Sequence, residues 1–480
     1  MNPRGAIVAL LGLAGCADLP GMAPHSRPLN SATINAGAAL RADAGDAWPE
    51  ASWWRAYCDP QLDALVARAL AGNPDLRIAA ARIERARGLA AVARGVTLPQ
   101  LGVEARFART YETREELSPA PSQAHSYWDD SILAGVRYDL DLWSQHRHAL
   151  ETAIDSVHVE EAESRAAQLA LTAAVVQSYV RLAAQFALRD VGSANLTRQT
   201  AVLDIARRRH EAEIGPQLEV DQASAVIPET EAQIERLDEA IGLERHRLAA
   251  LAGQGPGEGE TIARPALVLD RPARVPDRLP AELLGHRPDI VAQRWRVLAA
   301  GGEIEVAKAR FYPDVNLTAL VGVVSLGFDR LLARDATMGV VGPAISLPIF
   351  TGGRLRGNLT ARMADYDIAV EAYNGAVLNA MRDVADRLVT LRSLDRQLAL
   401  TDASLGFAQT AYQHAELGYR AGVTDYLTVL NAQAQLLVEQ RNRAQTISSQ
   451  LGAHAALMTA LGGGYAADPP PEPPGNRDSP

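Results

Sequence analysis

The sequence of this chain repeats itself, and the repeat limits the possible folds more than any other feature. Asn73-Pro74-Asp75-Leu76 recurs 214 residues later as Arg287-Pro288-Asp289-Ile290. Further along, Leu140-Asp141-Leu142-Trp143 corresponds to Leu347-Pro348-Ile349-Phe350, with the offset shortened to 207. Alanine-rich helices resemble one another by chance, but chance does not keep prolines and aromatic residues in the same order. We therefore expect the chain to build one structural unit twice.

Each copy begins with a helix that prolines delimit. Pro74 stands where the first turn of a helix accepts proline, and Pro99 ends the same helix. Pro288 and Pro313 occupy the matching places in the second copy. In both copies the helix leads into an extended segment.

Two segments in each copy alternate apolar and polar side chains. They cover residues 101–108 and 132–142 in the first copy, and 315–323 and about 338–349 in the second. This period predicts β-strands with two unlike faces. Segments of about ten residues with one apolar face suit strands that cross a membrane, although a soluble β-sandwich would show the same alternation. If the strands form a barrel, the side chains expected in its lumen are those of Arg106, Arg137, Asp139 and Asp141.

Four strands per chain have a consequence for assembly. The smallest membrane barrels have about eight strands, and lipid does not tolerate open strand edges. If these strands cross a membrane, several copies must share one barrel. On the order of eight strands would come from two copies, and about twelve from three.

A very long helix follows the strands of the first copy. From Trp143 to about Glu213 the chain contains no proline, which predicts a helix on the order of 100 Å long. The chain then turns near Gly215 and returns through residues 217–252. Pro228 lies inside this returning helix and is expected to kink or break it.

The second copy has the same pattern. It starts at Arg354, turns at Gly422 and returns to about Leu461. Helices of this length without a globular core are normally coiled coils. Each copy is therefore expected to contain one long helical hairpin.

The start of the sequence resembles a secretion signal. Arg4 precedes an apolar stretch at residues 6–13, and Leu13-Ala14-Gly15-Cys16 resembles the bacterial lipobox. We therefore expect a covalent diacylglycerol and an N-acyl lipid on Cys16, which would anchor the protein in a membrane; the alternative is an ordinary start in which Cys16 is accidental. Cys58, the other of two cysteines, is expected to be a small, partly buried residue rather than a redox site.

Composition and motifs argue against an enzyme or a nucleic-acid-binding protein. The net charge is −10 at pH 7, so the basic surface that nucleic acid requires is not expected. His146 and His148 are two residues apart and point to different sides of a helix. Glycine alternates from Gly253 to Gly259, but no Gly-Lys-Ser/Thr follows, so a phosphate loop is not supported. No catalytic, metal or cofactor-binding site is expected.

A set of motifs in a fixed order resembles the TolC-like outer-membrane factors. Within them the likeness is to the lipoprotein branch typified by OprM, often called the NodT family, and it covers roughly residues 53–461. Each motif is weak by itself, but their joint order is specific. They are Trp53-Trp54 with Asp59-Pro60-Gln61-Leu62, then Arg287-Pro288-Asp289-Ile290, Phe311-Tyr312-Pro313, Leu347-Pro348-Ile349-Phe350 with Gly352-Gly353-Arg354, Tyr419-Arg420-Ala421-Gly422 and Val429-Leu430-Asn431-Ala432-Gln433.

The resemblance implies a mixed fold, with a membrane β-barrel and an all-α coiled-coil barrel. A homotrimer would pool four strands per protomer into a 12-stranded barrel in the outer membrane, continued by a 12-helix tunnel through the periplasm. It would be the lipid-anchored outer-membrane channel of a tripartite efflux system, working with a periplasmic adaptor and an inner-membrane pump of the proton-driven RND type. The alternatives are the exit duct of a type I protein secretion system and a lipidated periplasmic adaptor. The substrate is left open.

The resemblance also implies a gate at the inner end of the tunnel. Gly215 and Gly422 would form the helix-tip turns that dock the adaptor, with Glu213 standing where the second copy has Gly422. Leu427 would be the apolar plug, flanked by Asp425 and Asn431. Asn431 replaces a common aspartate and Ala434 a common arginine, so an apolar or hydrogen-bonded closure is expected rather than a charge-locked one. Ordinary solvation of a helix tip is the alternative for each residue.

These expectations divide the chain into ten segments. They are a lipoprotein signal peptide at 1–15, a lipidated N-terminal extension at 16–52, the helices of the first copy at 53–98, the first β-hairpin at 99–142, the first long helical hairpin at 143–252, an equatorial linker at 253–287, the helix of the second copy at 288–312, the second β-hairpin at 313–350, the second long helical hairpin at 351–462, and a disordered proline-rich tail at 463–480.

Overall fold

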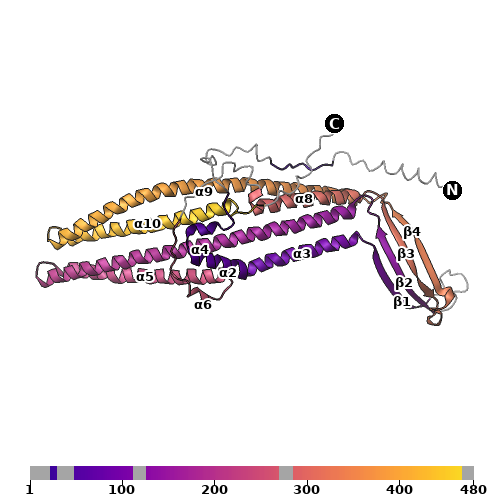
Figure 1. Cartoon of the computed structure of the whole chain (residues 1–480), viewed down its shortest axis with the longest axis horizontal. Coiled ribbons are helices and arrows are strands. Elements are labelled where there is room, and N and C mark those ends of the chain that lie inside the picture. The colour runs from indigo at the N-terminus through magenta and orange to yellow at the C-terminus, as the bar shows by residue number, and fades with distance from the viewer. Residues whose placement is uncertain (1–21, 30–47, 112–125, 270–284, 467–480) are drawn as a thin grey trace, which may run out of the picture.

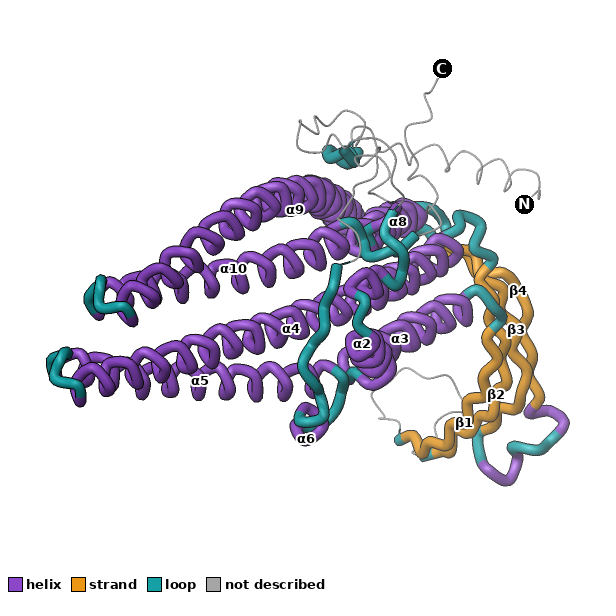
Figure 2. Tube along the Cα trace, turned by 60° about the vertical axis from the view of Figure 1, so that its left-hand side comes forward, coloured by secondary structure: helices purple, strands orange, loops and turns teal. Residues whose placement is uncertain are grey.

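The chain forms a long rod of helices with a small β-sheet at one end (Figure 1). The computed structural model describes residues 22–29, 48–111, 126–269 and 285–466. Two helical hairpins run side by side along the rod, and their turns lie together at the end opposite the sheet (Figure 2). Among the described residues, no helix combines the length and the apolar character that a membrane crossing requires.

The first half of the chain supplies three helices before the long hairpin and one after it. A 3-10 helix, η4 (Trp53–Tyr57), leads into α2 (Pro60–Gly72) and α3 (Pro74–Val96), and α6 (Pro256–Gly259) follows the hairpin. Capping side chains fix where α2 and α3 begin. Asp59 Oδ1 accepts the Gln61 backbone N–H at 2.9 Å, and Asn73 Oδ1 accepts that of Asp75 at 2.8 Å. In each case a proline occupies the first helical position, where its missing N–H costs nothing.

The long helices have the same lengths in the two halves. Helices α4 (Gln145–Glu211) and α9 (Arg354–Arg420) each contain 67 residues. The returning helices α5 (Gln217–Leu251) and α10 (Tyr426–Ala460) each contain 35. Helix α8 (Pro288–Ala309) precedes the second pair of strands, as α3 precedes the first. At 1.5 Å per residue, α4 and α9 are each about 100 Å long.

Pro228 does not break the first returning helix, so the expected break was wrong. Helix α5 is continuous from Gln217 to Leu251 with Pro228 inside it. A proline removes one intrahelical hydrogen bond, and two hydroxyls, one on either side of Pro228, bond back to backbone carbonyls of the same helix. Ser224 Oγ donates to the Val220 carbonyl at 2.7 Å, and Thr230 Oγ1 donates to the Val226 carbonyl at 3.0 Å. Packing along α4 keeps the rest of the helix in place.

The sheet has four antiparallel strands in sequence order. They are β1 (Gln100–Thr110), β2 (Tyr127–Asp139), β3 (Asp314–Ser325) and β4 (Thr337–Ser346). Two 3-10 turns, η5 (Phe328–Arg330) and η6 (Arg334–Ala336), connect β3 to β4. Pro343 pairs with Leu317 in the register of the last strand, which is where a sheet tolerates proline, because an edge strand leaves one side of its backbone unpaired.

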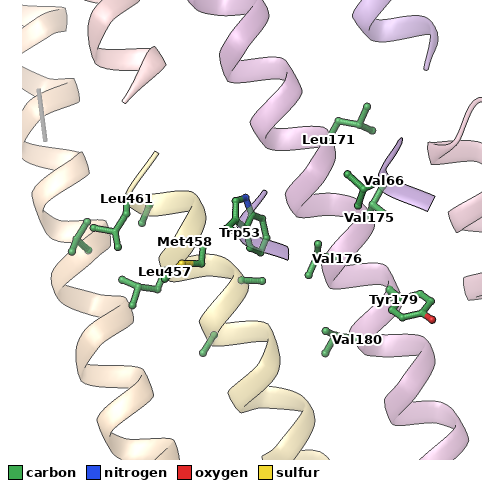
Figure 3. Close-up of a cluster of buried hydrophobic side chains, with 14 of the residues drawn as sticks. Trp53, Val66, Leu171, Val175, Val176, Tyr179, Val180, Leu457, Met458 and Leu461 are labelled. Atoms are coloured by element: carbon green, nitrogen blue, oxygen red, sulfur yellow. The ribbon is translucent and has the colours of Figure 1, made fainter. Parts of the chain in front are cut away.

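The largest apolar core lies midway along the rod, where the short helices pack against the long ones. Trp53 of η4 and Val66 of α2 meet Leu171 and Tyr179 of α4 and Leu457 of α10 (Figure 3). These side chains are nearly inaccessible to solvent. The core therefore fixes the two hairpins to each other at mid-length and leaves the rest of the rod to narrower helix contacts.

An N-terminal segment at 22–29 lies along α9. The backbone N–H groups of His25 and Ser26 both donate to Asp367 Oδ1, at 2.9 and 2.8 Å. The Leu29 N–H donates to Asn374 Oδ1 at 2.8 Å. Met22 packs against the cluster that contains Leu359 near the start of α9. The segment thus runs toward the sheet as the residue number falls.

Candidate functional site

The tips of the two helical hairpins are the first candidate site, because the gate residues expected from the sequence lie there. Asp425 caps the start of α10, where its Oδ1 accepts the Thr428 N–H at 2.9 Å. Hydrogen bonds from the Thr428 hydroxyl and backbone lower the pKa of Asp425 below its ordinary value. The carboxylate is therefore ionised and engaged as a helix cap within its own chain.

Leu427 and Asn431 lie on one exposed stripe of α10. Leu427 is 58% exposed, and Asn431, Ala434 and Val438 follow it on the same face at helical spacing. The stripe contains no charged side chain. The structure thus brings Leu427 and Asn431 to one surface, next to the turn that Asp425 stabilises.

The two turns use different residues for the left-handed backbone. In the second turn Gly422 has φ 73°, as glycine readily allows. In the first turn this conformation belongs to Glu213, with φ 59°, and Gly215 has no positive φ. Gly215 therefore does not supply the left-handed residue of the first turn. A Cβ on Gly215 would lie 3.1 Å from the Cβ of Arg209, so glycine serves close packing there.

A three-residue link that the sequence analysis missed joins the tips. Tyr419 of α9 is fully buried, and its hydroxyl donates to Glu219 Oε2 of α5 at 2.7 Å. The guanidinium carbon of Arg209, on α4, lies 4.9 Å from the centre of the Tyr419 ring. Burial and the adjacent Glu219 carboxylate raise the pKa of Tyr419 above its ordinary value, so the phenol stays protonated and remains a donor.

A second set of contacts joins the hairpins farther from the tips. Arg198 Nη2 donates to Gln440 Oε1 at 2.9 Å, and Gln433 Nε2 donates to Asn195 Oδ1 at 3.0 Å. The Arg198 guanidinium also lies 6.0 Å from the ring centre of Tyr412. These contacts are polar and few. They add to a buried apolar cluster nearer the tips, in which Val202 of α4 and Ala223 of α5 pack with residues of α9 and α10.

The sheet is the second candidate site, and its register produces two unlike faces. One row runs through Leu101, Val136, Ala319 and Val341 across all four strands. Facing side chains of neighbouring strands point to the same side of a sheet. This face is therefore apolar over the width of the protomer. Four side chains on this face are more than half exposed: Leu101, Val103, Val321 and Val341.

The opposite face carries the two arginines expected in a barrel lumen. Arg137 lies in a row with Gln100 and Thr318, and Arg106 lies in a row with Ser131. Both arginines are exposed in the protomer. The structure therefore separates them from the apolar row, on the face that is the more polar of the two.

Asp139 ends β2 on this polar face, two residues after Arg137, whereas Asp141 lies beyond the strand and does not extend the face. Strand β2 ends at Asp139, whose Oδ2 lies 2.8 Å from His146 Nε2 of α4. Asp141 has φ 44°, and its two carboxylate oxygens accept the backbone N–H groups of His146 and Arg147, each at 2.9 Å. Asp141 is thus a cap for α4 at the junction of sheet and helices. Capping the free N–H groups of the helix outweighs continuation of the strand.

Two further expectations concern the two cysteines. Cys16, the expected lipidation site, lies outside the described residues. Cys58 is exposed rather than partly buried; it ends η4 in a left-handed conformation, with φ 52°. In the parts of the chain that are described, no group of three or more histidine, cysteine or acidic side chains is arranged to hold a metal ion.

Comparison with known proteins identifies sequence relatives over nearly the whole chain. A family model described as "Outer membrane efflux protein" matches residues 65–254 and 279–463. The Fusaric acid resistance protein FusA of Burkholderia cepacia is 40% identical over 474 residues, which cover 94% of this chain and 86% of that protein. The multidrug resistance outer membrane protein MdtP of Escherichia coli (strain K12) is 31% identical, with 89% of each chain covered.

Solved structures show the same architecture. The outer membrane protein VceC from Vibrio cholerae matches with a TM-score of 0.82 and 35% identity, covering 87% of this chain and all of that one. The outer-membrane channel OprN matches with a TM-score of 0.80 and 27% identity, covering 94% of this chain and all of that one.

Proposed function

Because this chain belongs to the outer membrane efflux protein family, we propose that three copies of it form one gated exit duct across the periplasm and the outer membrane. The family expected from the sequence motifs is confirmed, and the protein is an outer-membrane component of an efflux system. The steps that lead from one protomer to a duct are assembly, closure and docking, and each has support in the described residues.

The observation that carries the proposal is that the protomer is open at both edges. In the described part of the chain, β1 and β4 each pair with a strand on one side only. Unpaired strand edges are not stable in lipid. A sheet with two different free edges can close by pairing β1 of one copy with β4 of the next, and such head-to-tail contacts generate a ring.

The helices beside these edges also expose apolar side chains. Helix α3, which precedes β1, exposes Ile78, Leu89, Val92 and Val96. Helix α9, which follows β4, exposes Ile368, Val389, Leu400 and Phe407. Stripes of this kind along two edges mark surfaces for other protein chains. The same neighbour would therefore cover both the strand edge and the helix edge.

The number of copies follows from the need for a barrel wide enough to leave a passage. Two copies would give about eight strands, and side chains fill the interior of a barrel of that size. Three copies give about twelve strands, the next multiple of four, with room for a passage. The four long helices of each protomer would continue this ring as a twelve-helix tunnel. The apolar face of the sheet would then meet lipid, and Arg106 and Arg137 would line the lumen.

The hairpin tips supply the gate of the proposed duct. A ring of three Leu427 side chains at a narrow mouth would resist wetting. Asn431 follows one turn later and adds a neutral polar ring, while Asp425 is occupied as a helix cap. These features support an apolar and hydrogen-bonded closure. The Arg209–Tyr419–Glu219 link would hold each protomer's tips in the closed arrangement.

The proposed partners of the duct are those that would connect its inner end to a source of energy. A passive tunnel needs a pump in the inner membrane, here proposed to be of the RND type, and an adaptor to connect the two. The turns at Gly215 and Gly422 are the surfaces that the adaptor would contact. A lipid on Cys16 would add an anchor in the outer membrane. The direction of the segment at 22–29, toward the sheet, is compatible with that anchor.

The relatives favour efflux over protein secretion. Their names refer to fusaric acid resistance, multidrug resistance, pyoverdine export and toluene efflux. Cargoes so different in chemistry support a passive lumen, with selection made by the pump. The alternative of a lipidated adaptor has no support in a chain whose relatives are outer-membrane components.

Conductance in planar bilayers tests the proposed duct and its gate. The purified protein should form channels that are mostly closed, and Leu427→Ser should increase the conductance several-fold. The matched control is Leu218→Ser, since Leu218 is the repeat counterpart of Leu427 on the first hairpin and is equally exposed. Equal effects of the two substitutions would remove Leu427 from the gate. Absence of any conductance from all three proteins would overturn the duct.

A further inference from the structure

A cavity lies between the two helical hairpins, in the half of the rod nearer the tips. Its volume is about 280 Å³, and α4, α5 and α10 all line it. Apolar side chains, among them Leu188, Val226, Leu237 and Leu430, form about half of its lining, and polar side chains, including Gln199, Thr230 and Gln233, form the rest. The cavity therefore contacts both hairpins at once.

Two buried amides form the floor of this cavity. Asn195 is 1% exposed and Gln433 is 5% exposed, and both line the cavity. Gln433 Nε2 donates to Asn195 Oδ1 at 3.0 Å. This bond leaves the NH₂ group of Asn195 and the carbonyl of Gln433 without a hydrogen-bond partner among the described residues. Exchanging O and N in both amides would again leave one donor and one acceptor.

Unused donors and acceptors on a buried floor favour an occupant that is itself polar at one edge. Gln199 Oε1, in the same lining, is buried and accepts no hydrogen bond from the described residues, and a buried polar group without a partner is unfavourable. An occupant that presents an acceptor to Asn195 and a donor to Gln433 would satisfy both groups. Primary carboxamides and lactams have this pair of groups side by side. The leucine and valine side chains of the lining suit a planar hydrocarbon body on the other edge.

The cavity is too small to hold a helix of a partner protein. One turn of an α-helix, about 5 Å long and at least 10 Å wide with its side chains, occupies roughly 400 Å³. An empty apolar cavity of about 150 Å³ binds benzene, so 280 Å³ accommodates a molecule of about two fused rings. At the rim, Glu229 and Arg441 have opposite charges, so a net charge on the ligand is not favoured.

We propose that this cavity binds a small, neutral, planar molecule with an amide or lactam edge, and that the bound molecule stabilises the closed arrangement of the hairpins. A ligand that contacts α4 and α5 on one side and α10 on the other binds best when the hairpins are together. Such a ligand shifts the population toward that arrangement. The second half of the proposal rests on the proposed duct, whereas binding itself does not.

The test uses quinolin-2-one, a two-ring lactam, and its N-methyl derivative, which lacks the N–H donor. Calorimetric titration of the full-length protein in detergent should show binding of the lactam in the micromolar to millimolar range. The N-methyl derivative should bind at least about tenfold more weakly, because the Gln433 carbonyl is left without a donor. Asn195→Leu should weaken binding of the lactam by a similar factor.

A second variant guards against misfolding of the first. Ala434 lines the cavity and is exposed, so Ala434→Phe should fill the space and abolish binding while the protein still folds. Equal affinity for the two ligands, or full affinity of Ala434→Phe, would overturn the site. Binding that leaves the conductance of the wild-type channel unchanged would overturn the effect on closure. The duct itself is judged by the conductance of the unliganded protein.

Discussion

The Tyr419 hydroxyl donates to Glu219 Oε2 at 2.7 Å, and this bond joins the tip of one helical hairpin to the other. The two residues are 200 positions apart in the chain and belong to different halves of the repeat. Around them, Val202, Tyr426 and Val429 form a small apolar cluster. Within this cluster, the Tyr419–Glu219 bond is a side-chain hydrogen bond that joins the tips directly, from a buried phenol to a carboxylate on the opposite hairpin.

Removing this hydroxyl should open the duct. Tyr419→Phe loses one hydrogen bond to a charged group, which contributes about 1.5 kcal/mol, and a tenfold change in the closed-to-open ratio corresponds to that energy. Single-channel recordings should show an open probability roughly tenfold higher. The matched control is Tyr412→Phe, because Tyr412 is buried in the same cluster and its hydroxyl makes no hydrogen bond to any described residue. If both variants behave alike, the tyrosine hydroxyl does not hold the tips.

The helical part of the protein should lose stability as the pH falls below about 6.5. Burial lowers the pKa of His454 to about 4, and the neutral ring contacts the Tyr57 hydroxyl at 3.1 Å. Because the folded-state pKa is below the unfolded one, the unfolded chain binds more protons between pH 6.5 and 4. Stability is then lost across that window, by about 1 to 3 kcal/mol in total.

Thermal unfolding followed by circular dichroism at several pH values checks this expectation. His454→Gln should flatten the pH dependence in that window. His414→Gln is the control, because His414 lies on the exposed surface of α9. If the pH dependence persists in His454→Gln, titration of other groups causes it.

The two faces of the sheet should respond differently to the same charge. Val321 lies in the apolar row with Ala134, whereas its neighbour Leu320 points to the opposite face with Gly135. On a lipid-facing surface an arginine costs about 2 to 4 kcal/mol near the midplane. Val321→Arg should therefore reduce the amount of assembled protein in outer-membrane fractions severely, and Leu320→Arg much less. The reverse order would place lipid on the other face.

Mass spectrometry of the intact mature protein tests lipidation at Cys16. The mature protein should carry the mass of a diacylglycerol and an acyl chain on its first residue, and Cys16→Ala should lack both. An unmodified Cys16 in protein isolated from the outer membrane would contradict the lipobox interpretation.

The sequence predicted the elements well where prolines and glycines mark their ends. Helices α3 and α8 begin at Pro74 and Pro288, and α9 ends beside Gly422. These residues act locally, through a fixed φ or a permitted positive φ, so their effect can be read without knowledge of the fold.

The errors lie where a tertiary or capping interaction competes with the local pattern. The alternation of apolar residues continues to Leu142, but β2 ends at Asp139 because Asp141 caps α4. Pro228 was expected to kink or break α5, and the break is wrong because the helix is continuous through it. In both cases the deciding partner is on another turn or element.

The link between Arg209, Glu219 and Tyr419 could not be predicted from the sequence. Its members lie on three different helices, and the sequence pattern does not define how the hairpins rotate against each other. A tyrosine near a helix end is also compatible with a solvated tip. Only the packing of the two hairpins shows that this ring is buried.

The number of chains in the assembled particle tests the central claim most directly. Native mass spectrometry of the protein extracted from the outer membrane in mild detergent should give one species with three chains, which dissociates to single chains only on heating. A species with one chain, whose β1 and β4 edges remain unpaired, would contradict the shared barrel and with it the duct.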